Sequence, residues 1–306
     1  MYSGDNLSDN RPSVRFKYHI WALLAVSAWG ASFIATKVLL QNGLNPVEIY
    51  IYRIIIAYIC VLCICPRPLL SHSWSDELKF ILIGMTGGSI YFIAENTAMR
   101  YTLVTNVSLI VTTAPLLSTF MLAALYKNER PRRGFVFGSV IAFLGVGFVI
   151  FNSSFEVKVM PMGDLLALLA ALCWAVYTIL LKPLNAVYSA WFITRKTFFY
   201  GVLTALPFLL VEPSTASIST LMQSAVWTNL LGLGIFCSMI AYVMWAQCIK
   251  GLGVMVTSNY LYVSPIVTLV LSALVLDEHV SWVGYTGCAL IMIGMFLSEK
   301  LNTKRF

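Results

Sequence analysis

Apolar runs of about 20 residues, separated by short polar connections, dominate this sequence. A hydrocarbon core about 30 Å thick requires about 20 apolar residues in a helix to cross it. Because a bilayer offers no water to the backbone, such runs are stable there as helices. The sequence therefore predicts an all-α polytopic membrane protein with ten transmembrane helices. The runs cover residues 18–40, 46–65, 80–99, 104–126, 134–151, 163–182, 190–211, 225–248, 253–276 and 282–298.

The composition excludes most other classes of protein. Of the 306 residues, 59% are hydrophobic and 11% are charged, whereas soluble domains carry about 45–50% apolar and about 25% charged residues. A soluble enzyme, a secreted disulfide scaffold and a disordered tail are therefore excluded. The first apolar run is as long as a full span and no cleavage pattern follows it, so we expect a retained helix and no removed signal peptide.

The positions of the cations predict the orientation of the chain. With ten crossings and the N-terminus inside, four of the 20 Lys and Arg residues fall on the outer side or in the outer half of a span, namely Lys37, Arg53, Arg100 and Lys158. The other sixteen fall on the inner side, as the positive-inside rule requires. We therefore expect both termini in the cytoplasm. The net charge of +7 reflects this topology, and no nucleic-acid partner is expected.

The two halves of the sequence resemble each other. Trp29 precedes Lys37 by eight residues, as Trp174 precedes Lys182, and residues 100–115 align without gaps onto residues 250–265. The register of about 145–150 residues equals five spans. Because five is odd, the second half enters the membrane from the opposite side, which is the architecture of alternating-access carriers. The alternative is a duplication kept only for packing, as channels also use duplicated helix bundles. The predicted units are a cytoplasmic segment at 1–17, a first repeat at 18–151, an external linker at 152–162, a second repeat at 163–298 and a cytoplasmic tail at 299–306.

These motifs resemble those of drug/metabolite transporters with paired EamA repeats. The resemblance rests on the Trp-x(7)-Lys of the first and sixth spans and on a proline in the fourth and ninth spans. It also rests on a loop glutamate followed nine residues later by glycine, at Glu129 and Gly138 and again at Glu278 and Gly287. The similarity covers about residues 18–300. It implies a ten-helix exporter or exchanger of small metabolites, commonly amino acids, with a cavity between two helix bundles.

Lys37, Arg53 and Glu95 lie inside predicted spans at similar depth near the outer side. A charge there costs about 2.5–3.5 kcal/mol on insertion scales, so these residues are functional candidates. We expect Glu95 to pair with Lys37 or Arg53 and to form an outer gate or a proton-sensitive site. The alternative is a static ion pair that fixes helix packing, with Lys37 and Arg53 extending to the interface.

Aromatic, polar and proline positions in both halves are candidates for a cavity wall. Pro115 and Pro265 interrupt predicted spans, which a membrane protein tolerates beside a cavity or a neighbouring helix. We interpret these helices as walls and hinges, or alternatively as packing kinks. Aromatic faces with polar tips suit organic cations and apolar side chains. The candidate substrate-binding and translocation residues are Trp29, Lys37, Arg53, Glu95, Asn96, Thr113, Pro115, Trp174, Tyr177, Trp245, Gln247, Tyr260, Tyr262 and Pro265.

Lys182 and Arg195 are the counterparts of Lys37 and Arg53 in the second half. They are candidates for an inner gate, and the alternative is positive-inside anchoring. Gly134, Gly138 and Gly145 in the fifth span predict close contact with another helix.

The chemistry of ATP-driven pumps and of metalloenzymes is missing from the sequence. It contains no Gly-x(4)-Gly-Lys-Ser/Thr phosphate loop and three histidines, all near span ends. We expect no cofactor and no metal. The partners expected are a small-molecule substrate and the lipid bilayer, and the oligomeric state stays open.

The sequence as a whole predicts a secondary transporter, working as an exporter in a bacterial inner membrane. It would carry small organic metabolites, such as amino acids, related compounds or drugs, by alternating access, with Glu95 as the candidate for proton coupling. A channel-like facilitator is the first alternative. The second is an intramembrane enzyme, which would need a catalytic cluster that this sequence lacks.

Overall fold

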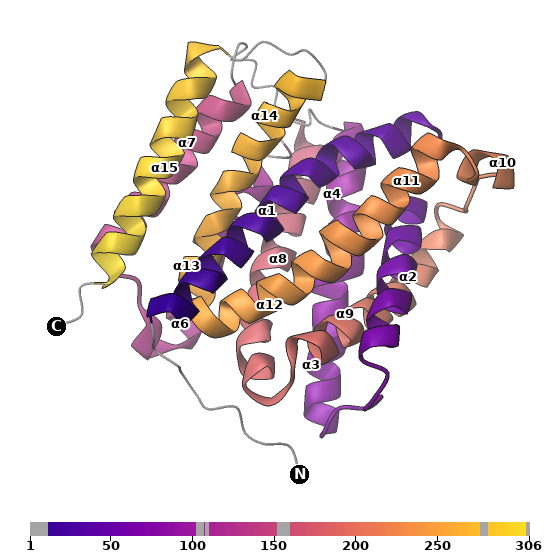
Figure 1. The fold of residues 1–306 in the computed structure, drawn as a ribbon, viewed down its shortest axis with the longest axis horizontal. Coiled ribbons are helices and arrows are strands. Elements are labelled where there is room, and N and C mark those ends of the chain that lie inside the picture. The colour runs from indigo at the N-terminus through magenta and orange to yellow at the C-terminus, as the bar shows by residue number, and fades with distance from the viewer. Residues whose placement is uncertain (1–11, 102–106, 108–109, 152–159, 276–280, 304–306) are drawn as a thin grey trace.

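The computed structural model describes residues 12–101, 107, 110–151, 160–275 and 281–303, and all regular elements in these ranges are helical (Figure 1). This confirms the all-helical prediction. The first half contains α1 (Pro12–Gln41), α2 (Pro46–Ile64), α3 (Trp74–Gly84), η1 (Met85–Ser89), α4 (Ile90–Tyr101), α6 (Ala114–Leu125), η2 (Lys127–Glu129) and α7 (Arg133–Phe151). The second half contains α8 (Pro161–Val187), α9 (Ala190–Ala205), η3 (Leu206–Leu210), α10 (Ile218–Leu221), α11 (Ser224–Gly232), η4 (Leu233–Ile240), α12 (Ala241–Leu252), α13 (Val254–Asn259), η5 (Tyr260–Val263), α14 (Ser264–Val275) and α15 (Trp282–Thr303).

Several helices are long and apolar enough to cross a membrane. Within the described residues, six continuous stretches meet both criteria by length and composition, and three shorter helices are apolar. The count of ten crossings stays a prediction. The six stretches are Arg15–Gln41, Pro46–Ile64, Trp74–Tyr101, Pro161–Val187, Ser224–Leu252 and Val254–Leu271, and the shorter helices are Ala114–Leu125, Arg133–Val149 and Trp282–Ser298.

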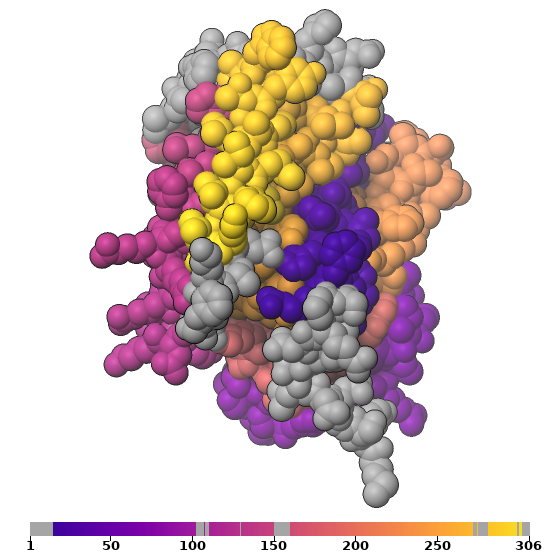
Figure 2. All heavy atoms as spheres, turned by 60° about the vertical axis from the view of Figure 1, so that its left-hand side comes forward, coloured from indigo at the N-terminus to yellow at the C-terminus, as the bar shows by residue number. Residues whose placement is uncertain are grey.

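The outer surface of the helix bundle is apolar. On α7 and α15, Phe137, Leu144, Met292 and Phe296 are all more than half exposed, and Figure 2 shows α15 forming one face of the molecule beside α14 and α1. Water penalises such a continuous apolar surface, whereas hydrocarbon does not. The surface therefore matches a lipid environment.

Local sequence signals fix several helix starts. Asn45 caps α2 by accepting a hydrogen bond from the backbone N–H of Glu48 at 2.9 Å, and the Glu48 carboxylate accepts from the Asn45 N–H at 2.8 Å. This capping box is followed by Pro46 at the first helical position, where a missing N–H costs nothing. Ser73 and Ser189 cap α3 and α9 in the simpler way, each through its hydroxyl.

The regular α-helix is interrupted next to each of the two prolines, as expected from the sequence, and each proline lies in the first turn of the helix that follows. Pro115 is in the first turn of α6, directly after a turn at Thr112 and Thr113, and Pro265 is the second residue of α14, directly after the 3₁₀ segment η5. The helix is broken by a turn before Pro115 and changes to a 3₁₀ segment before Pro265, and each ring occupies a first turn that needs no N–H from it.

The third and eighth predicted spans share an irregularity that the sequence does not reveal. The π-helical segment η1 separates α3 from α4, and the π-helical segment η4 separates α11 from α12. Inside η1, Gly88 departs from helical backbone angles, and the carbonyl of Gly87 accepts a hydrogen bond from the hydroxyl of Tyr242 at 2.6 Å. π segments often occur beside functional sites because they re-aim side chains.

Helices α7 and α15 pack backbone to backbone. A Cβ added to Gly138 would lie 2.4 Å from the Ser298 nitrogen and 2.6 Å from the Gly294 oxygen. One added to Gly145 would lie 2.8 Å from the Gly287 oxygen. Residue numbers rise along α7 as they fall along the facing α15, so the two helices are antiparallel. The close packing predicted from the glycines of the fifth span is confirmed.

Some sequence-based expectations fall on residues outside the described ranges. These include Glu278, the side chain of Glu129, most of the external linker at 152–162, and part of the alignment between 100–115 and 250–265.

Candidate functional site

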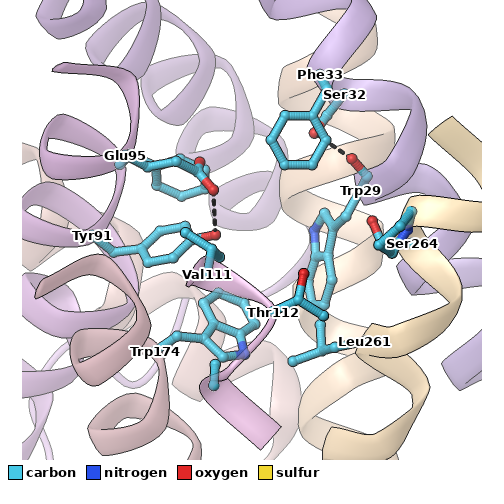
Figure 3. A pocket seen from close by; sticks show the side chains of 13 residues that line it. Trp29, Ser32, Phe33, Tyr91, Glu95, Val111, Thr112, Trp174, Leu261 and Ser264 are labelled. Carbon is cyan, nitrogen blue, oxygen red and sulfur yellow. Dashed lines mark hydrogen bonds between the residues drawn. The ribbon is translucent and has the colours of Figure 1, made fainter. Parts of the chain in front are cut away.

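A cavity lies between helices of the two halves. The first half contributes Trp29, Ser32 and Phe33 from α1, Tyr91, Phe92 and Glu95 from α4, and Val111, Thr112 and Ala114 around the start of α6. The second half contributes Trp174 from α8 and Leu261, Ser264 and Pro265 from η5 and α14. Figure 3 shows Tyr91, Glu95 and Trp174 on one side of the cavity and Trp29, Ser32, Phe33, Leu261 and Ser264 on the other, so that each side combines residues of both halves. The cavity volume is about 70 Å³, and a single water needs about 10–15 Å³, so several waters or one small ligand group fit in this conformation.

Glu95 is the charged residue of this wall. Its side chain is buried, with 5% of the residue exposed, and its Oε1 accepts a hydrogen bond from the Tyr91 hydroxyl at 2.8 Å (Figure 3). Tyr91 lies one helical turn before Glu95, so the helix itself positions this donor. The second carboxylate oxygen has no hydrogen-bond partner among the described residues, which leaves it available to a ligand.

A cluster of aromatic rings forms part of the cavity wall. Trp29 and Trp174 meet edge to face with centroids 5.0 Å apart, and Tyr91 lies 5.1 Å from Trp174. The indole N–H of Trp29 donates to the carbonyl of Cys237 at 2.8 Å, which fixes the orientation of that ring. Edge-to-face packing of this kind stabilises each ring position beyond the burial of its area. The walls of the cavity are therefore rigid aromatic surfaces.

Arg53 lies beside the cavity rather than in its wall. Its guanidinium sits over the ring of Phe92, 4.6 Å from the centroid, and its Nε donates to the Ser238 hydroxyl at 3.0 Å. Arg53 is close enough to Glu95 to act on it electrostatically, yet the two side chains form no ion pair. The direct pair expected from the sequence is therefore replaced by a longer-range interaction.

Lys37 does not contribute to the site. The residue is exposed, and within the described part of the chain it forms no ion pair with Glu95. The expectation that Lys37 pairs with Glu95 is therefore not met in this structure, in which Lys37 also lies outside the cavity lining.

The sequence-based candidate residues fall into three groups by their position relative to the cavity. Trp29, Glu95, Trp174 and Pro265 line the cavity. Tyr177 and Trp245 lie behind its wall, with their rings 5.1 Å and 6.0 Å from that of Trp174. The others are absent from the lining in this conformation, and they are Lys37, Arg53, Asn96, Thr113, Pro115, Gln247, Tyr260 and Tyr262.

Several of these absent residues have structural partners. Asn96 points its amide toward the Pro46 carbonyl at 3.5 Å, and the hydroxyl of Thr113 donates to the Ile110 carbonyl at 2.6 Å. Tyr260 contacts a ring nitrogen of His19 through its hydroxyl at 2.5 Å. Gln247 is half-buried, and Tyr262 is fully buried.

The proposed inner-gate residues occupy different environments. Lys182 is half-buried, with its ammonium over the ring of Tyr126 at 4.4 Å from the centroid. Arg195 is buried, and its guanidinium donates to the carbonyls of Cys65 and Pro68 in the connection between α2 and α3. Arg195 therefore ties a loop of the first half to a helix of the second.

Two polar networks between the halves escaped the sequence analysis. Lys196 on α9 forms an ion pair with Glu77 on α3, and the same carboxylate accepts from Tyr200. At the start of α2, Glu48 accepts from the Ser214 hydroxyl and from the N–H groups of Thr215 and Ala216 at 2.6–2.8 Å. Both carboxylates lie at span ends, where the sequence alone suggests solvent or capping.

Four cavity residues that are not among the sequence-based candidates lie one helical turn from residues that are. Tyr91 and Phe92 precede Glu95 by four and three residues, and Ser32 and Phe33 follow Trp29 by three and four. The helical period places such neighbours on one face, so this spacing was the available signal. Within the described residues, no group of three His, Cys, Asp or Glu side chains could hold a metal.

Comparisons with known proteins agree on a transporter. The chain is 28% identical over 289 residues to a "Probable terminal-alkyne amino-acid exporter" of Streptantibioticus cattleyicolor, covering 94% of this chain and 95% of the relative. It is 24% identical over 286 residues to a "Probable amino-acid metabolite efflux pump" of Escherichia coli, covering 91% and 93%. It is also 26% identical over 287 residues to an "Uncharacterized transporter" of Archaeoglobus fulgidus, covering 92% and 97%.

A solved crystal structure superposes with a TM-score of 0.79 over 95% of this chain and 100% of the other, at 18% identity. That likeness shows a shared fold. The model of the EamA-like transporter family matches twice, at residues 16–151 and 161–299, which is nearly the whole chain. The protein is therefore a membrane transporter and not an enzyme, and it belongs to the EamA-like transporter family.

Proposed function

We propose that this chain is a secondary carrier that exports small organic metabolites, such as amino acids, related compounds or drugs, by alternating access. The observation that carries the proposal is the position of the cavity. Its wall takes side chains from α1 and α4 in the first family match and from α8 and α14 in the second. Carriers built from two repeats bind their substrate where the repeats meet.

Two features support ten spans arranged as inverted five-helix repeats. Helices α7 and α15 occupy equivalent places in the two matches and run antiparallel. The π segments η1 and η4 also occupy equivalent places. A repeat accounts for the equivalent positions of the two π segments. Its inversion accounts for the opposite directions of α7 and α15.

The distribution of cations supports cytoplasmic termini and an inner face formed by the connection between α2 and α3. In Figure 1, the start of α1 and the end of α15 lie toward the same end of the molecule. We place the protein in a bacterial inner membrane. Amino acids are the first substrates to test, because two relatives are named for them.

Glu95 is the group we propose for proton coupling. It is buried, it lines the cavity, and it could exchange a proton with whichever side the cavity faces. The charged and titratable groups that act on it are Tyr91 of its own helix, Arg53 of α2 and Tyr242 of α12. A carrier driven by the solute gradient alone would not need this carboxylate.

The test is a counterflow assay in proteoliposomes loaded with unlabelled amino acids or amines, at two pH values. A carrier accumulates labelled solute transiently and saturates with concentration, because each cycle exchanges one bound molecule for another. A channel-like facilitator shows neither accumulation nor saturation, and that result would replace the carrier proposal.

A further inference from the structure

The described wall of the cavity carries negative charge only. Among the described residues that line it, Glu95 carries the only formal charge, and the other side chains are aromatic, aliphatic or hydroxyl-bearing. Its Oε1 is held by Tyr91 and its second oxygen has no partner in the described chain. An anion placed in this cavity meets a carboxylate on which Arg53 acts only from beside the cavity, whereas an ammonium group in the cavity pairs with that carboxylate directly.

The aromatic residues strengthen this preference. Trp29, Tyr91, Phe92 and Trp174 all reach the cavity surface, and the faces of such rings attract a cation within about 6 Å. Trp174 is close to both Trp29 and Tyr91, so a ligand beside Glu95 contacts more than one ring. A carboxylate and several aromatic faces together form a site for an alkylammonium group.

Within the described lining a carboxylate meets hydroxyl donors, from residues such as Ser32 and Ser264, but no charged donor. Nη2 of Arg53 and the indole nitrogen of Trp174 have no hydrogen-bond partner among the described residues, but both atoms are buried with almost no accessible surface. The guanidinium of Arg53 packs over Phe92, which itself forms the wall. A zwitterionic amino acid therefore finds a charged partner for its ammonium group here and only neutral hydroxyl donors for its carboxylate.

We propose that this cavity selects small organic monocations, that is amines without a carboxylate, over amino acids and organic anions, with Glu95 as the counter-ion. This inference rests on the proposed function in one respect, because it assumes that the transported solute occupies this cavity. The cavity volume of about 70 Å³ favours a compact amine over a bulky one.

The test uses the purified full chain in detergent and three ligands that share one isobutyl group: 3-methylbutylamine, leucine and 4-methylpentanoate. Binding is followed by intrinsic tryptophan fluorescence, since Trp29 and Trp174 line the cavity. We expect saturable binding of the amine, at least about tenfold tighter than leucine, and still weaker binding of the acid. Leucine or the acid binding as tightly as the amine overturns the proposal, and so does an amine that does not bind.

Three variants make the result specific. Glu95→Gln weakens amine binding by about tenfold or more, while Glu95→Asp keeps the preference for the amine over the acid. Glu212→Gln is the matched control, because it removes a carboxylate that pairs with Arg100 away from the cavity, and it leaves amine binding unchanged. Melting temperatures of all three variants report whether each one folds. If Glu95→Gln folds and binds the amine like the parent, Glu95 is not the counter-ion.

Counterflow in proteoliposomes separates this inference from the proposed function. If the protein binds the amine but shows no amine counterflow, the proposed carrier function is contradicted and the proposed preference of the cavity for amines is supported. If the protein shows leucine counterflow but does not bind the amine, the proposed carrier function is supported and the proposed preference for amines is overturned.

Discussion

Gly145 on α7 and Gly287 on α15 face each other backbone to backbone, and a Cβ on either one would lie 2.7–2.8 Å from the carbonyl oxygen of the other. Gly138 and Gly294 meet in the same way seven residues, or about two turns, further along the helices. With the same offset of 149 residues that relates Glu129 to Glu278, Gly138 corresponds to Gly287 and Gly145 to Gly294. The two contacts therefore exchange when the halves are exchanged, as residue pairs do across a two-fold axis.

This packing predicts a sharp difference between two glycines of one helix. Gly145→Ala forces α7 away from α15 and costs about 1–3 kcal/mol, as overpacking typically does. Gly147→Ala, two residues further on, meets nothing within 4 Å and gains up to about 1 kcal/mol of helix propensity. Melting temperatures in detergent compare the two, and equal effects would contradict the packing described.

The buried ion pair between Glu77 and Lys196 predicts a strong effect on stability. Their side chains are 9% and 5% exposed, and removing one member of such a pair leaves a buried charge, at about 3–5 kcal/mol. Lys196→Met should therefore lower the melting temperature sharply, and adding Glu77→Gln should restore part of the loss. The exposed pair of Arg100 and Glu212 is the control, since breaking it costs at most about 1 kcal/mol.

Blocking the cavity should abolish transport without unfolding the protein. Ser32 lines the cavity and its hydroxyl donates to the Trp29 carbonyl of its own helix at 2.7 Å. Ser32→Leu fills part of a small space, and we expect counterflow to fall by about tenfold or more. Thr286→Leu is the matched control, because Thr286 bonds its own helix in a similar way on the exposed surface of α15. Normal counterflow by a folded Ser32→Leu variant would place the transport path elsewhere.

Proton coupling through Glu95 predicts a change in pH response. In wild-type proteoliposomes, an imposed pH gradient should accelerate net solute flux, because protonation of the buried carboxylate is part of the cycle. Glu95→Gln cannot take up or release the proton and should lose that acceleration, while Glu95→Asp should retain it at a reduced rate. A pH response that persists in Glu95→Gln would remove Glu95 from the coupling step.

The sequence predicted the helices well because a hydrocarbon environment imposes length and composition on every span. It also identified Trp29, Trp174, Glu95 and Pro265, since an internal charge, a proline and repeated tryptophans stand out in an apolar run. Tyr91, Phe92 and Phe33 did not stand out, because an aromatic ring in a lipid-facing position has the same sequence context as one in a cavity wall. Lys37 lies outside the cavity lining, which its depth in the predicted span does not reveal.

The sequence could not predict tertiary contacts that have no local sequence pattern. Glu77 and Lys196 lie at the ends of spans that are far apart in the sequence, so their burial against each other depends on the packing of α3 on α9. The π segments η1 and η4 have no local sequence signature, and a glycine such as Gly88 permits one without specifying it.

The central claim, that the two repeats cross the membrane in opposite directions, can be tested most directly by labelling single cysteines in intact cells. In a background with the seven native cysteines replaced, Asn128→Cys lies between α6 and α7, and Trp282→Cys lies at the exposed start of α15. We expect a membrane-impermeant maleimide to label Trp282→Cys from outside and to label Asn128→Cys only after the cells are opened. Labelling of both positions from the same side would contradict the inverted repeat and the carrier built on it.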